Sequence, residues 1–156
     1  MSLSNTIRFI LAHPLARRNR ALALSRLLKW QINIRLNPYP VLYPFVGETN
    51  LLVWKGLTGA TGNIYTGLHE FEDMAFMLHF LRGEDVFADV GANVGSYTVL
   101  AAGVAGSKTI AIEPLPVTFN ILSDNLTINH LSEKVTRLNI GIGAAAGVLR
   151  FTRGLD

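Results

Sequence analysis

The period of the hydrophobic pattern changes along the chain, and each change predicts a different kind of element. The pattern is helical up to Leu36, where three prolines begin to break it, and we place one helix at Leu15–Leu36. Two short apolar runs follow at 41–46 and 51–54. The turn-rich residues between these runs predict a β-hairpin.

The segment between the hairpin and the first motif is expected to contain a loop and a helix. Four glycines between positions 56 and 67 predict an irregular loop. From Phe71 to Leu81, apolar side chains recur at spacings of three and four, which predicts a helix packed on the core. Gly83 suits the position just after the end of that helix.

After Gly83, short apolar strands alternate with helices. The expected strands are 86–90, 109–112 and 135–142, and the expected helices are 96–104 and 116–129. Such alternation with short connections predicts parallel strands joined by right-handed crossovers, and therefore a layered α/β fold. The last stretch, 147–153, is expected to pair as one more strand or hairpin.

Composition narrows the class of protein. With 156 residues, of which 49% are hydrophobic and 16% charged, the chain is too apolar for intrinsic disorder. No run of about 18 uncharged apolar residues predicts a membrane-spanning helix. The absence of cysteine excludes disulfides, thiolate metal sites and cysteine nucleophiles. It also fits a reducing compartment, so we expect a cytoplasmic protein.

Positive charge is concentrated at the N-terminal end. Residues 1–47 contain seven basic side chains and no acidic one, whereas the remaining residues contain seven basic and eleven acidic side chains. This asymmetry fits contact with nucleic acid, anionic lipid or an acidic partner, and equally a solvated helical face or an organelle transit segment. On a helix over 15–36 the cations point in nearly all directions, which argues against a membrane-surface helix. Pro14 interrupts the apolar run that a signal peptide would need.

The most informative segment is a strand that enters a glycine-rich turn and opens a helix. It runs Val86-Phe-Ala-Asp89-Val-Gly91-Ala-Asn93-Val-Gly95-Ser-Tyr-Thr98. Gly91 and Gly95 lack a Cβ, so the backbone there can turn sharply and approach a ligand closely. Free N–H groups at the helix start are expected to favour a carboxylate or a phosphate.

Two acidic residues distinguish the cofactor classes that use such a turn. A dinucleotide site needs glycine where this chain has Asn93 and Ser96, and Asp89 would repel a pyrophosphate. Asp89 would instead attract a cationic amine, such as the α-amino group of S-adenosylmethionine. Glu113 ends the second strand, 24 residues after Asp89, where an acid accepts hydrogen bonds from ribose hydroxyls. The residues therefore favour S-adenosylmethionine over a nicotinamide dinucleotide.

Each of these residues also has a purely structural explanation. The glycines could close any strand-to-helix turn, Asp89 could cap the amides of the turn, and Glu113 could be a solvated strand end. Asn93 could be present because asparagine tolerates a left-handed backbone. The pattern leaves these alternatives open.

No residue is assigned to catalysis. The candidate general bases His69, His79 and His130 lie in no recognisable catalytic context, and each is equally explained as a packed or surface histidine. No spacing of His, Asp or Glu predicts a metal site.

The glycine-rich segment and Ala111-Ile-Glu113-Pro114-Leu-Pro116 together resemble the signature of the FkbM-type S-adenosylmethionine-dependent methyltransferases. The resemblance spans about residues 40–153 and includes Asn125–Asn129 and Asn139–Gly143. It implies the class I Rossmann-like fold, S-adenosylmethionine as cofactor, and O-methylation of a hydroxyl on a sugar or natural-product small molecule. The cofactor-binding residues that it implies are Asp89, Gly91, Ala92, Asn93, Gly95, Ser96, Thr98, Glu113, Pro114 and Asn139, with Tyr65 and Glu70 upstream.

We expect three segments: a basic helical arm at 1–36, a hairpin, loop and lead-in helix at 37–83, and the cofactor-binding half of a Rossmann-like domain at 84–156. A complete class I sheet has seven strands, and the first three alone would leave an apolar edge, so we expect the chain to be part of a protein nearer twice this length.

The leading alternative function is a non-catalytic Rossmann-like module that binds nucleic acid or lipid through the basic arm. A nicotinamide-dependent oxidoreductase ranks third. For the methyltransferase, nucleic acid is not the favoured partner, whereas peripheral membrane contact and a homo-oligomer stay open.

Overall fold

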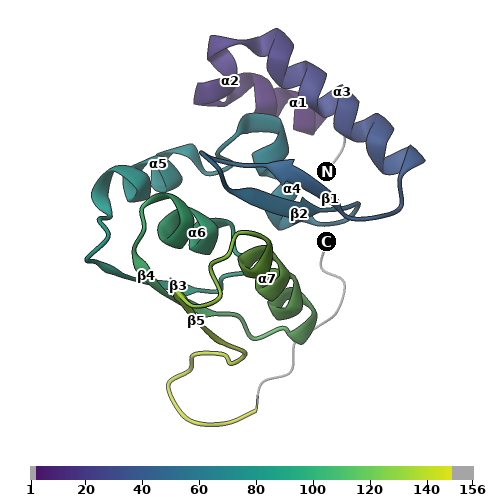
Figure 1. Ribbon diagram of the computed structural model, residues 1–156. Coiled ribbons are helices and arrows are strands. Elements are labelled where there is room, and N and C mark those ends of the chain that lie inside the picture. Colours follow the sequence, from purple (N-terminus) through teal and green to yellow (C-terminus); the bar gives the residue numbers. More distant parts are fainter. Residues whose placement is uncertain (1–2, 149–156) are drawn as a thin grey trace. The chain divides into compact units, whose positions relative to one another are not determined.

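The chain folds into two compact units, Met1–His79 and Phe80–Asp156. The structure is a computed structural model, and it describes residues 3–148 (Figure 1). The predicted segments 1–36 and 37–83 fall almost entirely within the first unit. The predicted cofactor-binding half, 84–156, falls within the second.

The first unit combines helices with a two-stranded hairpin. Its elements are α1 (Leu3–Ala12), α2 (Pro14–Arg18), α3 (Arg20–Leu36), β1 (Val41–Pro44), β2 (Asn50–Val53), α4 (Thr58–Thr66) and α5 (Phe71–Phe80). The two strands are antiparallel and pair Val41 with Val53 and Pro44 with Asn50, which confirms the predicted hairpin. α4 contacts both α3 and β2, and its buried Ala60 and Ile64 belong to the core of this unit (Figure 1).

The single helix predicted at Leu15–Leu36 is wrong at its N-terminal end, where α2 and α3 meet. Asn19 separates them with a backbone φ of −152°, which is not helical. The side-chain oxygen of Asn19 accepts a hydrogen bond from the Leu22 N–H at 2.9 Å and caps α3. Asparagine favours caps over helix interiors because its side chain competes for backbone groups. The hydrophobic pattern alone does not carry that signal.

The irregular loop predicted at 56–67 is also wrong, because α4 occupies most of it. A glycine in a helix costs about 1 kcal/mol relative to alanine, but packing overrides this preference here. Gly62 is required on α4 because a Cβ there would overlap the imidazole ring of His69. The helix ends at Thr66. The next residue, Gly67, has a φ of +91°, which favours glycine, and its N–H donates to the Asn63 carbonyl at 2.8 Å.

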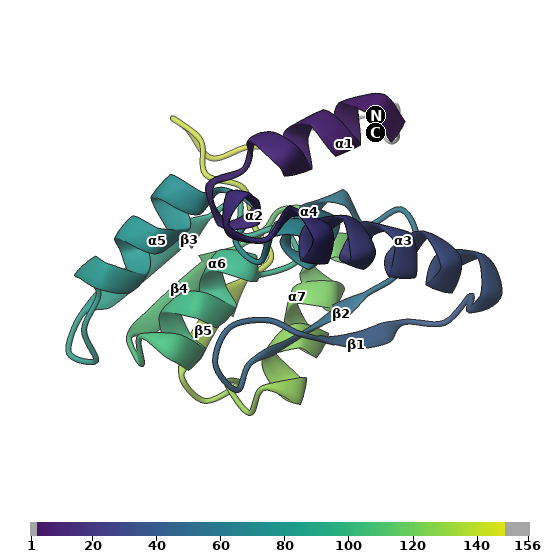
Figure 2. The ribbon, with the colours of Figure 1, turned by 90° about the horizontal axis from the view of Figure 1, so that it is seen from above.

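The second unit contains a parallel sheet with helices, as the alternating pattern predicts. Its elements are β3 (Val86–Val90), α6 (Ser96–Val99), a π-helical turn η1 (Leu100–Val104), β4 (Lys108–Ile112), α7 (Pro116–Ile128) and β5 (Val135–Leu138). The strand order is β3-β4-β5 and both pairs are parallel. α6 and α7 lie on the same face of the sheet (Figures 1 and 2). The sequence expectation of an α/β fold is confirmed.

The register of the sheet places the candidate site. Val90 of β3 pairs with Ile112 of β4, so the residues that follow these two strands leave the sheet at the same edge. The turn at 91–95 and Glu113 therefore begin side by side. Under them, Val99, Leu100, Leu122 and Leu126 are fully buried and form the core between the helices and the sheet.

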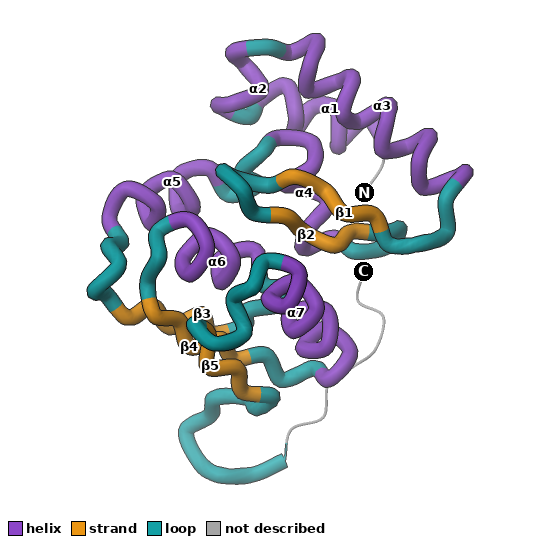
Figure 3. The backbone as a smooth tube through the Cα atoms, viewed as in Figure 1, coloured by secondary structure: helices purple, strands orange, loops and turns teal. Residues whose placement is uncertain are grey.

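The third strand is shorter than predicted. Regular pairing ends at Leu138, and residues 139–148 form a loop instead of continuing a strand to 142 (Figure 3). The side chain of Asn139 donates to the Glu113 carbonyl at 2.7 Å, so the first residue after β5 uses a side-chain bond where the ladder stops. Within the additional strand predicted at 147–153, Gly147 and Val148 have no regular structure. Its remaining residues lie outside the described part of the chain.

The close approach of Gly62 to His69 gives a direct test of α4. We expect Gly62→Ala to lower the free energy of unfolding by about 1–3 kcal/mol, because the new methyl group overpacks against the ring. In a His69→Ala background, Gly62→Ala should raise the free energy of unfolding by up to about 1 kcal/mol, since alanine is the better helix former. Urea unfolding of the four variants measures both effects. An effect of the same sign in both backgrounds would show that His69 is not the constraint.

Candidate functional site

The turn after β3 has a left-handed backbone at three of its five residues. The φ angles are +79° at Gly91, +51° at Asn93 and +88° at Gly95. Asparagine tolerates this region better than other side chains, so the structural explanation for Asn93 is supported. Asn93 also stands where a dinucleotide turn has its second glycine.

The two glycines of the turn have different surroundings. A Cβ on Gly95 would lie 2.5 Å from Cδ1 of Leu122, so Gly95 lets α7 pack closely against the turn. A Cβ on Gly91 would meet no atom within 4 Å. Gly95 thus serves packing, whereas Gly91 borders open space that a ligand could occupy.

The amides of the turn are largely used within the protein. The N–H groups of Gly91 and Ala92 both donate to the Ile112 carbonyl, at 2.9 and 3.0 Å, and the Gly95 N–H donates to the Ala92 carbonyl at 2.8 Å. The Asn93 N–H donates to a carboxylate oxygen of Glu113 at 2.9 Å. These four amides of the turn are therefore already satisfied within the protein, by the strand, by the turn itself and by the Glu113 carboxylate.

Glu113 joins the turn to the end of β4. Its Oε2 accepts the Asn93 N–H, and its Oε1 accepts the Leu115 N–H at 2.9 Å. The side chain is only 5% exposed, so it is not a solvated strand end. A buried carboxylate is stable when hydrogen bonds satisfy it, and here each oxygen accepts one backbone N–H. Each oxygen still has a second acceptor position, because a carboxylate has about four.

Asp89 is the second buried acid of the site. It is 8% exposed, and its Oδ2 accepts a hydrogen bond from the Thr98 hydroxyl at 2.5 Å. Burial raises the pKa of Asp89, the hydrogen bonds from the Thr98 hydroxyl and backbone N–H lower it, and the nearby Glu113 carboxylate raises it further. Asp89 thus caps the start of α6 and also carries a poorly solvated charge.

Two asparagines brace the site from elements that come later in the chain. Asn139 donates to the carbonyls of Glu113 and Pro114, at 2.7 and 3.2 Å, so the predicted residues Pro114 and Asn139 do lie together. Asn125 of α7 is fully buried and donates to the Val94 carbonyl in the turn at 2.8 Å. The role of Asn125 was not predicted from the sequence, although an asparagine between the apolar residues 122 and 126 of a helix indicates a buried hydrogen bond.

The structure therefore groups most of the predicted cofactor-binding residues at one edge of the sheet. Ala92, Ser96 and Thr98 are buried at the turn and the first residues of α6. Together with the residues above, they place ten of the twelve predictions in the second unit, namely Asp89, Gly91, Ala92, Asn93, Gly95, Ser96, Thr98, Glu113, Pro114 and Asn139.

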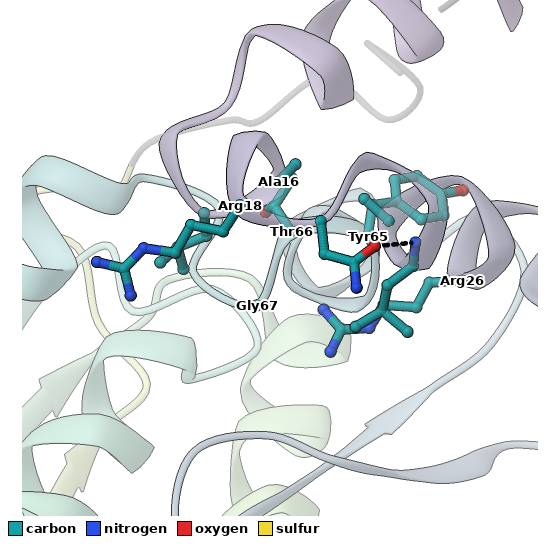
Figure 4. A pocket seen from close by; sticks show the side chains of 10 residues that line it. Ala16, Arg18, Arg26, Tyr65, Thr66 and Gly67 are labelled. Atoms are coloured by element: carbon teal, nitrogen blue, oxygen red, sulfur yellow. Dashed lines mark hydrogen bonds between the residues drawn. The ribbon is translucent and has the colours of Figure 1, made fainter.

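The other two predicted residues lie in the first unit. Tyr65 is buried on α4, and its hydroxyl accepts a 3.4 Å hydrogen bond from Gln31 Nε2. It lines a pocket of about 330 Å³ whose wall includes Arg18 and Arg26 (Figure 4). Glu70 is exposed just before α5. The cofactor role of Tyr65 and Glu70 stays a prediction.

The three candidate bases occupy separate positions in the chain. His69 packs against Phe9 with ring centroids 5.1 Å apart, and its Nδ1 is buried without a hydrogen-bond partner. His79 lies in the last turn of α5, and His130 follows α7 with a φ of +56°. Within residues 3–148, no three His, Asp or Glu side chains are grouped as a metal site would require. In the same range, no helix has the length and hydropathy needed to cross a membrane.

Comparison with known proteins finds similarity to a methyltransferase over part of the chain. No family model matches the chain. Over 83 residues, which are 53% of this chain, it is 31% identical to the methyltransferase sdnD of Sordaria araneosa, and the match covers 32% of that protein. The chain therefore spans about a third of the length of this relative.

Solved structures share the fold at low sequence identity. Pyrococcus horikoshii TYW2 in complex with MeSAdo matches 67% of this chain and 37% of its own, with a TM-score of 0.55 and 17% identity. M. jannaschii TYW2 in complex with AdoMet matches 65% of this chain and 43% of its own, with a TM-score of 0.52 and 21% identity. The α/β fold of this chain thus matches the Rossmann-like fold of these solved structures, and the predicted fold class is confirmed. The finer resemblance to FkbM-type enzymes stays a prediction.

The raised pKa of Asp89 predicts a pH-dependent stability. A folded chain that holds this proton more tightly than the unfolded chain loses stability as pH rises through the interval above the ordinary aspartate pKa. Asn in place of Asp89 keeps an acceptor for Thr98 and removes the desolvated charge. We therefore expect Asp89→Asn to raise the free energy of unfolding at neutral pH. The gain should disappear below about pH 3, where the carboxyl is protonated in both states.

Urea unfolding at neutral and acidic pH measures this effect. Asp124→Asn is the matched control, because Asp124 is exposed on α7. If Asp89→Asn is less stable than the parent chain at neutral pH, the prediction is wrong. The hydrogen bonds from Thr98 to the Asp89 carboxylate then outweigh the cost of burying its charge.

Proposed function

We propose that this chain carries the S-adenosylmethionine-binding half of a methyltransferase. One observation carries the proposal: the buried carboxylates of Asp89 and Glu113 lie at the carboxyl ends of two adjacent parallel strands. The backbone N–H of Asn93 donates to Glu113 and so connects it to the turn. Ligands of such sheets bind outside the carboxyl ends of the strands. The similarity to sdnD supports the assignment to methyl transfer.

The chemistry of the site fits the cofactor. Glu113 has an unused acceptor position on each oxygen, which suits the two hydroxyls of a ribose. Asp89 suits a cationic α-amino group, because a positive partner would offset the cost of its buried charge. Open space at Gly91 leaves room for the ligand to approach the backbone. We assign the methionine part to Asp89 and the turn, and the ribose to Glu113.

The same features argue against a nicotinamide dinucleotide. A pyrophosphate needs free amides and no nearby anion. Here four amides of the turn are already bonded within the protein, and two buried carboxylates stand beside it. A pyrophosphate would therefore meet repulsion with few donors to offset it.

Bound S-adenosylmethionine supplies an electrophilic methyl group, and the residues of this chain hold and orient the ligand. Because methyl transfer is an in-line displacement, positioning contributes much of the rate enhancement. The FkbM-type resemblance supports a hydroxyl on a sugar or natural-product small molecule as the acceptor. The cysteine-free composition supports a cytoplasmic location.

Titration calorimetry with S-adenosylhomocysteine tests the proposal. We expect the 156-residue chain to bind this ligand, and we expect Glu113→Gln to weaken binding at least tenfold. Hydrogen bonds to a charged group contribute about 1.5–3 kcal/mol, and 1.4 kcal/mol corresponds to a factor of ten.

A control is needed because Glu113→Gln also removes an acceptor from a backbone N–H, which costs about 1–3 kcal/mol of stability. Ser107→Ala is matched, since the buried Ser107 hydroxyl donates to the Ala101 carbonyl at 3.0 Å just before β4, at the opposite end of that strand. It should lower stability and leave affinity unchanged. Equal affinity in Glu113→Gln and the parent chain refutes the assigned role of Glu113. A thermal shift with NAD but none with S-adenosylhomocysteine would favour the oxidoreductase.

A further inference from the structure

The side of α3 that faces solvent carries a row of aliphatic side chains. Leu28, Ile32 and Leu36 follow one another at intervals of four residues, so they lie on one side of the helix. Leu28 is 62% exposed and Leu36 is 80% exposed. Single exposed aliphatic side chains are common, but a contiguous row on one helix marks an interaction surface.

Two cations stand beside this row. Leu22, Arg26 and Lys29 occupy the adjoining strip of α3, and Leu22 is also an exposed aliphatic residue. Arg26 and Lys29 line a groove of about 540 Å³ together with Asn33, Tyr43 and Phe45. We call Leu22, Arg26, Leu28, Lys29, Ile32 and Leu36 the outer face of α3.

The charged side chains of α1, α2 and α3 are all of one sign. The first acidic residue of the chain is Glu48, so α1, α2 and α3 contain no carboxylate that could pair with their cations. Seven basic side chains within residues 1–47 therefore create a positive field over these helices. A surface that covers the outer face must be apolar where it meets the leucines and anionic where it meets Arg26 and Lys29.

We propose that the outer face of α3 docks on an anionic lipid bilayer. Leu28, Ile32 and Leu36 enter the boundary between headgroups and acyl chains, and Arg26 and Lys29 contact lipid phosphates, for which the groove provides room. Interfacial helices combine these two features, buried apolar side chains and cations near anionic lipid. From the sequence alone, cations on several sides of the helix argue against a membrane-surface helix. In the structure, the side of α3 with Ala23, Leu27 and Trp30 is buried in the unit, so the proposed membrane contact involves only the outer face with Arg26 and Lys29.

Nucleic acid fits this face less well. Binding of single strands relies on aromatic rings that are open for base stacking. Trp30 is buried, and the Tyr43 hydroxyl donates to the Ile64 carbonyl at 3.1 Å. The exposed Tyr39 lies beyond the end of α3 and is not part of the outer face. A nucleic acid on Arg26 and Lys29 would also place phosphates beside exposed leucines.

Co-sedimentation with lipid vesicles tests the proposal. We expect the 156-residue chain to bind vesicles of phosphatidylcholine mixed with phosphatidylglycerol, and to bind pure phosphatidylcholine at least tenfold more weakly. Each cation near an anionic surface contributes about fivefold to partitioning, so Arg26→Gln with Lys29→Gln should weaken binding about 25-fold. Leu28→Gln with Leu36→Gln, which keeps good helix formers, should weaken it at least tenfold.

Matched controls lie away from the outer face. Lys55→Gln removes an exposed cation of the same unit, and Val117→Gln replaces an exposed aliphatic residue of α7. Both should bind vesicles as the parent chain does, and circular dichroism should show equal helix content in all variants.

Three results would overturn the proposal. The first is vesicle binding that is unchanged by Leu28→Gln with Leu36→Gln, because such binding would rest only on attraction between the basic side chains and the anionic lipid. The second is binding of an RNA oligonucleotide without binding of anionic vesicles. The third is a dimer, detected by light scattering, that the two leucine substitutions dissociate while vesicles do not bind. Because S-adenosylhomocysteine binding is measured without lipid, failure of this proposal leaves the proposed function untouched.

Discussion

The carboxylate of Glu113 is the interaction on which the second unit depends. It accepts the Asn93 N–H with one oxygen and the Leu115 N–H with the other, so one buried side chain connects the turn after β3 to the chain leaving β4. Both amides would otherwise be donors near a buried edge of the sheet, and an unpaired donor costs about 1–3 kcal/mol. The carbonyl of the same residue accepts the Asn139 side chain, which ties the loop after β5 to this point. Glu113 is therefore a structural residue and a ligand candidate at once.

The charge of Asp89 lowers the stability of the fold, but the same charge would favour binding of a cationic ligand group. Burial and the neighbouring Glu113 both disfavour its charge, and the hydrogen bonds from Thr98 offset only part of that cost. Side chains with perturbed pKa values at the carboxyl ends of parallel strands are typical of functional sites. A cationic ligand group would offset the cost of burying the Asp89 charge. This gives a physical reason for Asp89 and Glu113 to lie close together beside Gly91, which borders open space.

The sequence predicts the second unit better than the first, because the strands and the turn of the second unit follow from patterns within short segments of the chain. The parallel strands and the turn at 91–95 follow from short apolar runs and glycine spacing. The bonds that hold the turn, from Asn93 to Glu113 and from Asn125 to Val94, join residues 20 and 31 positions apart, and no local pattern encodes them. In the first unit, α4 forms although Gly59 and Gly62 lie within it. His69 lies close against Gly62, a contact that helix propensity cannot anticipate. The outer face of α3 likewise becomes visible only when its buried side is known.

The central claim is that Glu113 and the turn hold an S-adenosyl ligand, and the most direct measurement is a ¹H–¹⁵N NMR titration of the chain with S-adenosylhomocysteine. The amide resonances of Asn93 and Leu115 report on the Glu113 carboxylate, because both donate to it. They should shift as the ligand binds, together with that of Gly91, while the amides of Leu42 and Leu52 in the hairpin of the first unit stay in place. If Asn93 and Leu115 do not move at a ligand concentration that saturates binding, the ligand does not contact Glu113 and the claim is contradicted.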